Sequence, residues 1–209
     1  MCNTLGLNEG FAHMDEKQKY DELYEIAESQ AGYFTAEQAR NVGFSWERLS
    51  ENAATGKFNR IQHGIYRLSH FPSSRFEDLF IAWLSAGVNS VISHESALSV
   101  YELSENLPSE IHVILPRTTS RRKQGFRIHT NALSPEEITW KEGLRVTTVE
   151  RTLVDVFTSG IAQEQVELAA HQALQRGLIT PESLLQQGTK HSKAMFQRFQ
   201  KILSKEIRG

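Results

Sequence analysis

The feature that most constrains the fold is a series of helix start and stop signals within residues 20–68. Apolar residues recur at helical spacing from Tyr20 to Ala27, while acidic residues occupy other positions of the same stretch. Thr35 and Gln38 then have the spacing of a capping box, in which each side chain accepts a hydrogen bond from a backbone N–H at a helix start. Signals this closely spaced predict short helices in a small module.

A third helix and a hairpin complete this module. Ser45 is expected to cap a helix that begins at Trp46, with Trp46 on its inward face. Residues 57–68 hold two short apolar-rich runs around Gly64, which is typical of a β-hairpin with glycine in the turn. Three helices followed by a hairpin predict a winged helix-turn-helix over residues 15–71.

The remainder of the chain mixes helical and strand patterns. After a boundary at Phe71–Ser74, residues 111–115 and 126–129 alternate as strands do and are expected to pair. Apolar residues at helical spacing near the C-terminus indicate a final amphipathic helix. We therefore predict an α+β chain: a flexible extension (1–14), the winged helix-turn-helix, and a mixed α+β domain (75–209) that ends in this amphipathic helix.

Charge and cysteine content narrow the function classes. The net charge is −2, so any nucleic-acid site must be a local basic patch. The single cysteine, Cys2, allows neither an internal disulfide nor a cysteine-based zinc site. No apolar run approaches the roughly 20 residues of a membrane span. We expect a soluble cytoplasmic protein that does not associate with membranes.

The third helix and the hairpin carry the first set of candidate DNA-binding residues. DNA reading requires polar side chains on the outer face of a helix, and basic residues beside it that meet phosphates. The expected outer-face residues are Ser45, Arg48 and Asn52. The expected phosphate contacts are Lys57, Arg60, His63 and Arg67, in a stretch that contains no acidic residue.

A second basic patch lies between the two strands predicted at residues 111–115 and 126–129. Its cations are Arg117, Arg121, Arg122, Lys123 and Arg127, and it contains no acidic residue. Such a segment can neutralise phosphates and steer association with DNA. It can equally bind an acidic protein or RNA, or be a solvated hairpin loop without a function.

Neither catalysis nor metal binding is predicted. His94, His112 and His129 lack the i, i+4 spacing of a metalloprotease helix, and satisfied structural histidines are the more common case. Arg151 is expected to form ion pairs with an architectural role. We therefore expect no catalytic residue, no metal and no cofactor, and interpret the protein as a non-enzyme.

Several stretches of the chain resemble one known family. They are Gly32–Thr35, Gly56–Tyr66, His94–Leu98, Ile111–Pro116 and Val146–Asp155. In this order and spacing they are similar to the AbiEi-type abortive-infection antitoxins, over roughly residues 20–175. The resemblance implies the antitoxin of a type IV toxin–antitoxin system, a phage-defence class, with an N-terminal winged helix.

The resemblance also implies partners and residue roles. Such an antitoxin represses its own operon by binding promoter repeats in double-stranded DNA. Its second domain counteracts a nucleotidyltransferase-like toxin without requiring a stable complex. On this basis Arg48, Asn52, Lys57, Arg60 and Arg67 map to the recognition helix and wing, and Arg121, Arg122 and Lys123 would extend the phosphate-contacting surface.

Other functions remain open at this point. Glu47 and Glu51 lie on the expected recognition helix and would repel phosphate, which favours a protein-interaction module that binds an acidic partner. A stand-alone transcriptional regulator of the same shape, without a toxin, would have the same sequence pattern. Some related architectures instead carry a metal-dependent nuclease domain. Such a domain needs an acidic metal site with an E-x-K motif, and this chain contains no E-x-K.

Overall fold

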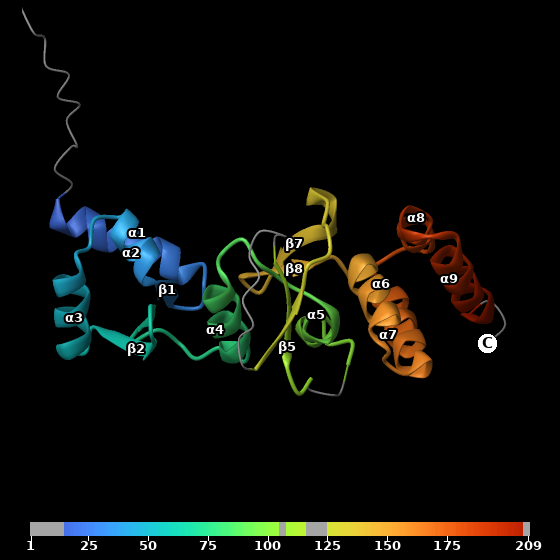
Figure 1. Cartoon of the computed structure of the whole chain (residues 1–209), viewed down its shortest axis with the longest axis horizontal. Helices are drawn as coiled ribbons and strands as arrows, with labels where there is room; N and C mark the ends of the chain where they lie inside the picture. Colours follow the sequence, from blue (N-terminus) through green and yellow to red (C-terminus); the bar gives the residue numbers. More distant parts are fainter. Residues whose placement is uncertain (1–14, 105–107, 116–124, 207–209) are drawn as a thin grey trace, which may run out of the picture. The chain divides into compact units, whose positions relative to one another are not determined.

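The computed structural model describes residues 15–104, 108–115 and 125–206 of the chain. Contacts between residues divide the chain into two compact units, with the division between Pro72 and Ser73. Figure 1 labels helices and strands of both units, numbered in chain order.

The N-terminal unit combines helices with a three-stranded antiparallel sheet. Its elements are α1 (Glu16–Glu28), β1 (Tyr33–Thr35), α2 (Ala36–Asn41), α3 (Trp46–Ala54), β2 (Phe58–Gln62) and β3 (Ile65–Leu68). The strand order is β1-β3-β2, so the short first strand pairs with the return strand of the hairpin. Helices α2 and α3 form the helix-turn-helix, and the β2–β3 hairpin is the wing.

The local signals of the sequence explain where these elements begin and end. Thr35 Oγ1 accepts from the Gln38 N–H at 3.1 Å, and Gln38 Oε1 accepts from the Thr35 N–H at 2.8 Å, which confirms the capping box. Gly64 has a φ of +75°, a left-handed conformation that favours glycine in the hairpin turn. The predicted hairpin is therefore confirmed.

Aromatic side chains form much of the core of this unit. Phe34 is fully buried, and its ring lies 5.0 Å from that of Phe58 and 5.8 Å from that of Tyr66. Tyr20 of α1 meets Phe44 edge-on at 5.0 Å, and Leu49 brings α3 into the same cluster. Aromatic pairs at these separations stabilise a small core beyond the area that they bury.

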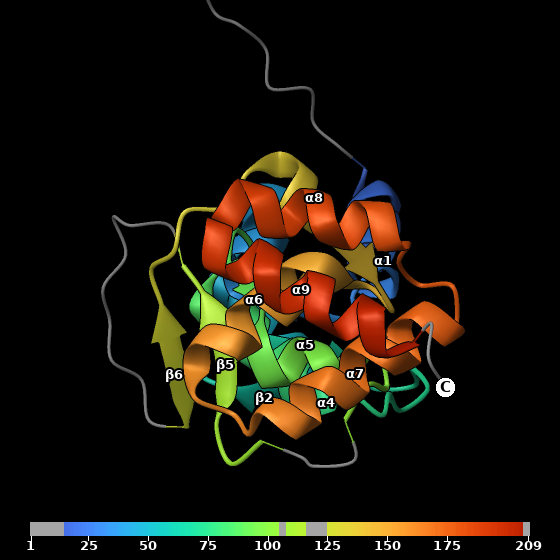
Figure 2. The same cartoon turned by 90° about the vertical axis from the view of Figure 1, so that its right-hand side faces the viewer.

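The C-terminal unit is α+β, as predicted. Its elements are α4 (Glu77–Ala86), β4 (Val91–Ile92), α5 (His94–Val100), β5 (Ile111–Ile114), β6 (Phe126–His129), the 3-10 turn η1 (Pro135–Glu137), β7 (Ile138–Lys141), β8 (Leu144–Thr147), α6 (Val149–Ser159), α7 (Gln163–Gln175), α8 (Pro181–His191) and α9 (Lys193–Glu206). The strand order is β6-β5-β4-β8-β7. Figure 2 shows α5 beside β5, with β6 next to it.

The pairing of β5 with β6 confirms one prediction and corrects another. The two strands do pair, with Ile111 opposite Phe126 and Ile114 opposite His129, but they run parallel. A two-residue hairpin joins only antiparallel strands, whereas parallel strands need a longer crossover. The two strands therefore do not form a hairpin, which was one of the expected arrangements.

The last two helices pack against each other and confirm the predicted amphipathic C-terminal helix. Phe199 and Ile202 of α9 are buried, and α8 runs beside α9 in both views (Figures 1 and 2). The helices approach closely at Gly188, where an added Cβ would lie 2.9 Å from the Phe199 ring and 3.0 Å from the Phe196 Cα. Only glycine fits this contact without a shift of the helices.

Candidate nucleic-acid interface

The N-terminal end of α3 is exposed and is the part of a recognition helix that usually reaches base edges. Ser45 caps it, since its Oγ accepts from the Arg48 N–H at 3.2 Å. The prediction that Trp46 faces inward is wrong, because its side chain is 53% exposed. Hydrogen bonds from its own backbone N–H and from Ser45 lower the pKa of Glu47, so this exposed end carries a negative charge at neutral pH.

Asn52 does not lie on the outer face of α3, which corrects the prediction. It is only 5% exposed, its Oδ1 accepts from the Tyr20 hydroxyl at 2.8 Å, and its Nδ2 donates to the Arg48 carbonyl at 2.8 Å. The physical reason is helical periodicity, because Asn52 follows the buried Leu49 by three residues and shares its face. Asn52 thus joins α3 to α1 instead of facing solvent.

Arg48 is half-buried and also directed toward α1. Its guanidinium forms an ion pair with Glu16 and lies 5.5 Å from the Tyr20 ring and 5.9 Å from the Phe44 ring. The predicted role of Arg48 as a base-reading residue on the outer face is therefore not favoured by its position. Its charge is balanced by Glu16 and its stem covers the aromatic cluster.

The wing presents its cations to solvent. Lys57, Arg60 and His63 are all exposed, and along β2 only Phe58 is buried. A bulge between Arg60 and Gln62 interrupts the register with β3. Arg60 Nη2 lies 3.4 Å from His63 Nδ1, so these two side chains are side by side at the wing tip. This stretch has the exposure and charge that phosphate contacts require.

Arg67 is the exception among the cations of the wing. Its Nη2 donates to the Phe71 carbonyl at 2.9 Å and to the Pro72 carbonyl at 2.7 Å, and its guanidinium lies 5.3 Å from the Tyr33 ring. These contacts attach the end of the N-terminal unit to its sheet. The position favours a structural role over the predicted phosphate contact.

Sequence reasoning missed one cation next to α3. Arg40, in the last turn of α2, is exposed, and its guanidinium lies 5.3 Å from the Trp46 ring. The turn between the two helices brings these side chains together. The signal that could have found them is the helix-turn-helix itself, in which the first helix crosses the DNA backbone beside the N-terminus of the second.

Of the cations predicted in the second basic patch, the structure describes one. Arg127 lies on β6 and is exposed. The other predicted residues of this segment, Arg117, Arg121, Arg122 and Lys123, lie outside the described residues.

The C-terminal unit contains a buried ion network around Arg151. Its Nε donates to Asp155 Oδ1 at 2.9 Å, and its Nη1 donates to Glu137 Oε1 at 3.0 Å. Gln187 of α8 donates to the same Glu137 oxygen at 2.6 Å. Burial raises the pKa of Asp155 to about 6, against the opposing effect of Arg151. The network links η1, α6 and α8, in keeping with the architectural role expected for Arg151.

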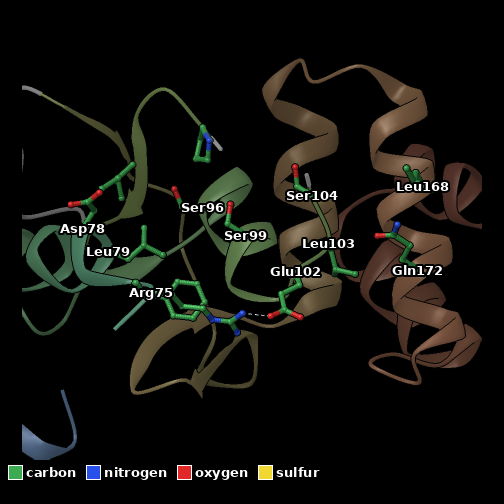
Figure 3. A pocket seen from close by; sticks show the side chains of 13 residues that line it. Arg75, Asp78, Leu79, Ser96, Ser99, Glu102, Leu103, Ser104, Leu168 and Gln172 are labelled. Atoms are coloured by element: carbon green, nitrogen blue, oxygen red, sulfur yellow. Dashed lines mark hydrogen bonds and ion pairs between the residues drawn. The ribbon is translucent and has the colours of Figure 1, made fainter. Parts of the chain in front are cut away.

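A cavity of about 570 Å³ lies in the C-terminal unit, between α4, α5 and α7 (Figure 3). An ion pair between Arg75 and Glu102 stands at its border, and Leu168 and Gln172 line it from α7. Ser96 also lines it, but its Oγ accepts from the backbone N–H of His112 at 2.9 Å. The described residues that line the cavity do not indicate which ligand it would bind.

The element order and the β1-β3-β2 sheet of the N-terminal unit define a winged helix-turn-helix protein. Residues 21–69 match the model of a family described as "Transcriptional regulator, AbiEi antitoxin". The match confirms the resemblance seen in the sequence for these residues, which lie within the N-terminal unit. The chain has no match among the curated proteins. Within the described residues, no helix combines the length and apolar character needed to cross a membrane.

Proposed function

We propose that this protein is a sequence-specific DNA-binding repressor that controls its own operon as the antitoxin of a type IV toxin–antitoxin pair. The observation that carries the proposal is an exposed wing without acidic residues, on a winged helix that matches a family of antitoxin regulators. Lys57, Arg60 and His63 would contact phosphates, and the N-terminal end of α3 would approach the major groove beside Arg40. The protein would act in the cytoplasm, without enzymatic activity.

The DNA-binding part is tested on a labelled fragment of the protein's own upstream region, with non-specific competitor and a salt series. Replacing Lys57 and Arg60 together by alanine is expected to weaken binding about 10- to 100-fold, because two charge-assisted phosphate contacts are lost. The slope of log affinity against log salt should become shallower by about 2.

A matched control removes the same charge elsewhere. Lys17 on α1 and Lys190 on α8 are both exposed, and the double variant Lys17→Ala, Lys190→Ala should keep the wild-type affinity and salt slope. Equal losses in both double variants would contradict a specific role of the wing. Retained tight binding by the Lys57→Ala, Arg60→Ala variant would overturn it.

The antitoxin part is proposed for the C-terminal unit, by resemblance. It would counteract a nucleotidyltransferase-like toxin without a stable complex. The test is growth of cells that express such a toxin from the same operon, with and without this protein. A variant that has lost promoter binding through Lys57→Ala and Arg60→Ala should still restore growth, if neutralisation belongs to the C-terminal unit.

A second function is favoured by the composition of the exposed end of α3. Trp46 is 53% exposed, and aromatic residues are enriched in protein interfaces. Glu47 and Glu51 are exposed on the same helix and would repel phosphate. In that case the winged helix and basic segment would bind an acidic protein partner. Recovery of a stoichiometric partner, together with no specific promoter binding, would favour this function over the first.

A further inference from the structure

Three histidines that are distant in the sequence meet in the C-terminal unit. His94 begins α5, His112 lies on β5 and His129 lies on β6, and one ring nitrogen from each falls within 4.8 Å of the others. We propose that these three side chains bind a divalent first-row transition-metal ion, with Zn²⁺ as the preferred member. Imidazole nitrogens are ligands that such ions favour.

The strand register accounts for two of the three ligands. In the parallel β5–β6 pair, Ile114 stands opposite His129, so these two residues project from the same face of the sheet. His112 lies two positions before Ile114 on β5 and therefore shares that face. Both histidines thus project from one face. His129 Nε2 lies 3.3 Å from His112 Nδ1. Two nitrogens that each lie about 2.0–2.1 Å from one tetrahedral zinc ion are about 3.3–3.4 Å apart. This pair therefore already has the spacing of two ligands on one ion.

His94 is placed to supply the third ligand. Its ring stacks on that of His129, with 3.7 Å between centroids, and lies 5.5 Å from that of His112. Rotation of the His94 ring about its side-chain bonds would exchange this stacking for coordination. The backbone of His94 has a φ of +51°, an uncommon conformation for a residue other than glycine.

Neighbouring polar groups are positioned as the outer partners of metal ligands. His94 Nδ1 lies 2.9 Å from Ser93 Oγ, which leaves Nε2 for an ion. His112 Nε2 lies 3.9 Å from a carboxylate oxygen of Glu95, on the side of the ring opposite Nδ1. Metal-bound histidines usually direct their second nitrogen at a carboxylate or another acceptor, which sets the ring orientation.

The surroundings keep the imidazoles in the form that binds metal. His94 and His112 are buried, while His129 is half-buried and gives an ion access from solvent. Burial, reinforced by the neighbouring histidines, lowers the pKa of His94 to about 3 and that of His129 to about 4. Neutral imidazole is the ligand form, so no proton must leave at neutral pH.

Two neighbouring positive charges oppose the ion, and one of them is exposed. Arg127 is exposed on the same face of β6 as His129, and its positive charge would reduce the affinity for a divalent cation. Arg151 also acts on His94, more strongly there than Arg127 does, but its guanidinium is paired with Asp155 and Glu137. Replacing Arg127 should therefore tighten metal binding, and this gives a test at a position where a folding defect is not expected.

A bound ion would link β6, at one edge of the sheet, to helix α5. Among the described strands, β6 lies at one edge of the sheet and pairs with β5. The three ligands join β6 to β5 and to the start of α5. The ion would stabilise the C-terminal unit and hold the strand that follows the basic segment. Zinc binding at this site is independent of DNA binding by the wing, so either can fail alone.

The experiment uses the full chain without an affinity tag, stripped of metal by a chelator that is then removed. Titration with zinc chloride in a calorimeter is expected to show one ion per chain, and Co²⁺ should give the visible absorption of a tetrahedral site. The melting temperature should rise by about 5–10 °C when zinc exceeds its dissociation constant about 100-fold.

Three variants decide whether these histidines are the ligands. His129→Gln should abolish the cobalt spectrum and the rise in melting temperature, and circular dichroism checks that it folds. His191→Gln changes an exposed histidine of α8 and should behave as the wild type. Arg127→Gln should bind zinc several-fold more tightly.

Two results would overturn the site. One is the absence of saturable zinc or cobalt binding by the wild-type protein at submillimolar metal. The other is wild-type affinity in the His129→Gln variant, or weaker binding by Arg127→Gln, because either would place the ion elsewhere.

Discussion

The two parts of the winged helix that were expected to meet DNA use their polar side chains in opposite ways. On α3, Arg48 pairs with Glu16 and Asn52 is bonded to Tyr20, so both hold α3 against α1. On the wing, Lys57, Arg60 and His63 stand in solvent. The difference follows from packing: one face of α3 covers the core, whereas the core contacts of the hairpin come from Phe58 and from Ile65 and Tyr66 of β3, which leaves the rest of β2 in solvent.

This contrast separates side chains that stabilise the fold from those that are available to a ligand. A basic or amide residue on a recognition helix is not a DNA contact until its face is known. On the wing, Arg60 and His63 are exposed, whereas Arg67 of β3 donates to backbone carbonyls. Substitutions on α3 should therefore change stability, and substitutions on the wing should change binding.

Among the variants that test this contrast between α3 and the wing, Asn52→Ala is expected to change the free energy of unfolding most. Removing the buried amide leaves the Tyr20 hydroxyl without its acceptor and should lower the free energy of unfolding of the N-terminal unit by about 1–3 kcal/mol. Urea denaturation followed by circular dichroism measures this change. DNA affinity of the folded protein should stay close to that of the wild type.

The control for Asn52 is an asparagine of the wing. Asn59 is exposed on β2, and Asn59→Ala should change stability by no more than about 0.5 kcal/mol. If the two variants were equally stable, the buried position of Asn52 would have no energetic consequence, and the contrast between α3 and the wing would fail.

A second prediction asks whether α3 approaches DNA at all. Replacing Glu47 and Glu51 together by glutamine removes two negative charges from the exposed side of α3. If α3 lies in the groove, promoter affinity should rise about threefold to tenfold, because like charges that face each other are relieved. Fluorescence anisotropy with the labelled upstream fragment measures the change.

The matched control changes two acids of α1. Glu25 and Glu28 are exposed, and the double variant Glu25→Gln, Glu28→Gln alters the net charge by the same amount. Similar promoter affinities for the two double variants would show that Glu47 and Glu51 do not lie closer to the DNA phosphates than the acids of α1 do. The wing alone would then carry the binding.

The smallest effect is expected from Arg48→Met. The ion pair with Glu16 is partly exposed, and such pairs contribute at most about 1 kcal/mol. The methionine side chain can still cover the aromatic rings of Tyr20 and Phe44. Stability should fall by less than about 1 kcal/mol, and promoter affinity should change by no more than about twofold.

Arg60→Met provides the opposite pattern with the same chemical change. Its stability should match that of the wild type, while its promoter affinity falls, since Arg60 is exposed at the wing tip. Thermal melts and anisotropy on both variants complete the comparison. A larger loss of binding for Arg48→Met than for Arg60→Met would reverse the assignment of the two regions.

Several parts of the fold could be predicted because their signals are local. The capping box at Thr35 and Gln38 and the hairpin turn at Gly64 each depend on residues within a few positions of one another. Strands β1 and β7 were not predicted. β1 has only three residues and exists because Tyr33–Thr35 pairs with β3, about 30 residues later in the chain.

The candidate sites differ in the same way. The exposure of Lys57, Arg60 and His63 was predicted, whereas the hydrogen bonds of Arg67 to the Phe71 and Pro72 carbonyls were not. The burial of Asn52 was not predicted. The prediction placed Trp46 on the buried face of α3, and Asn52 then falls on a different, solvent-exposed face. His94, His112 and His129 were interpreted as structural histidines, and their meeting was not predicted, since they come from three elements and nothing in their spacing brings them together.

The sequence by itself therefore determined where helices begin, where the hairpin turns and where positive charge is concentrated. These properties depend on backbone hydrogen bonds and charges between near neighbours. Only the tertiary structure decided which side of α3 is covered, that β5 and β6 run parallel, and that His112 and His129 lie 3.3 Å apart. The physical reason is that such contacts arise from the packing of elements distant in the chain, where burial of apolar surface selects the arrangement.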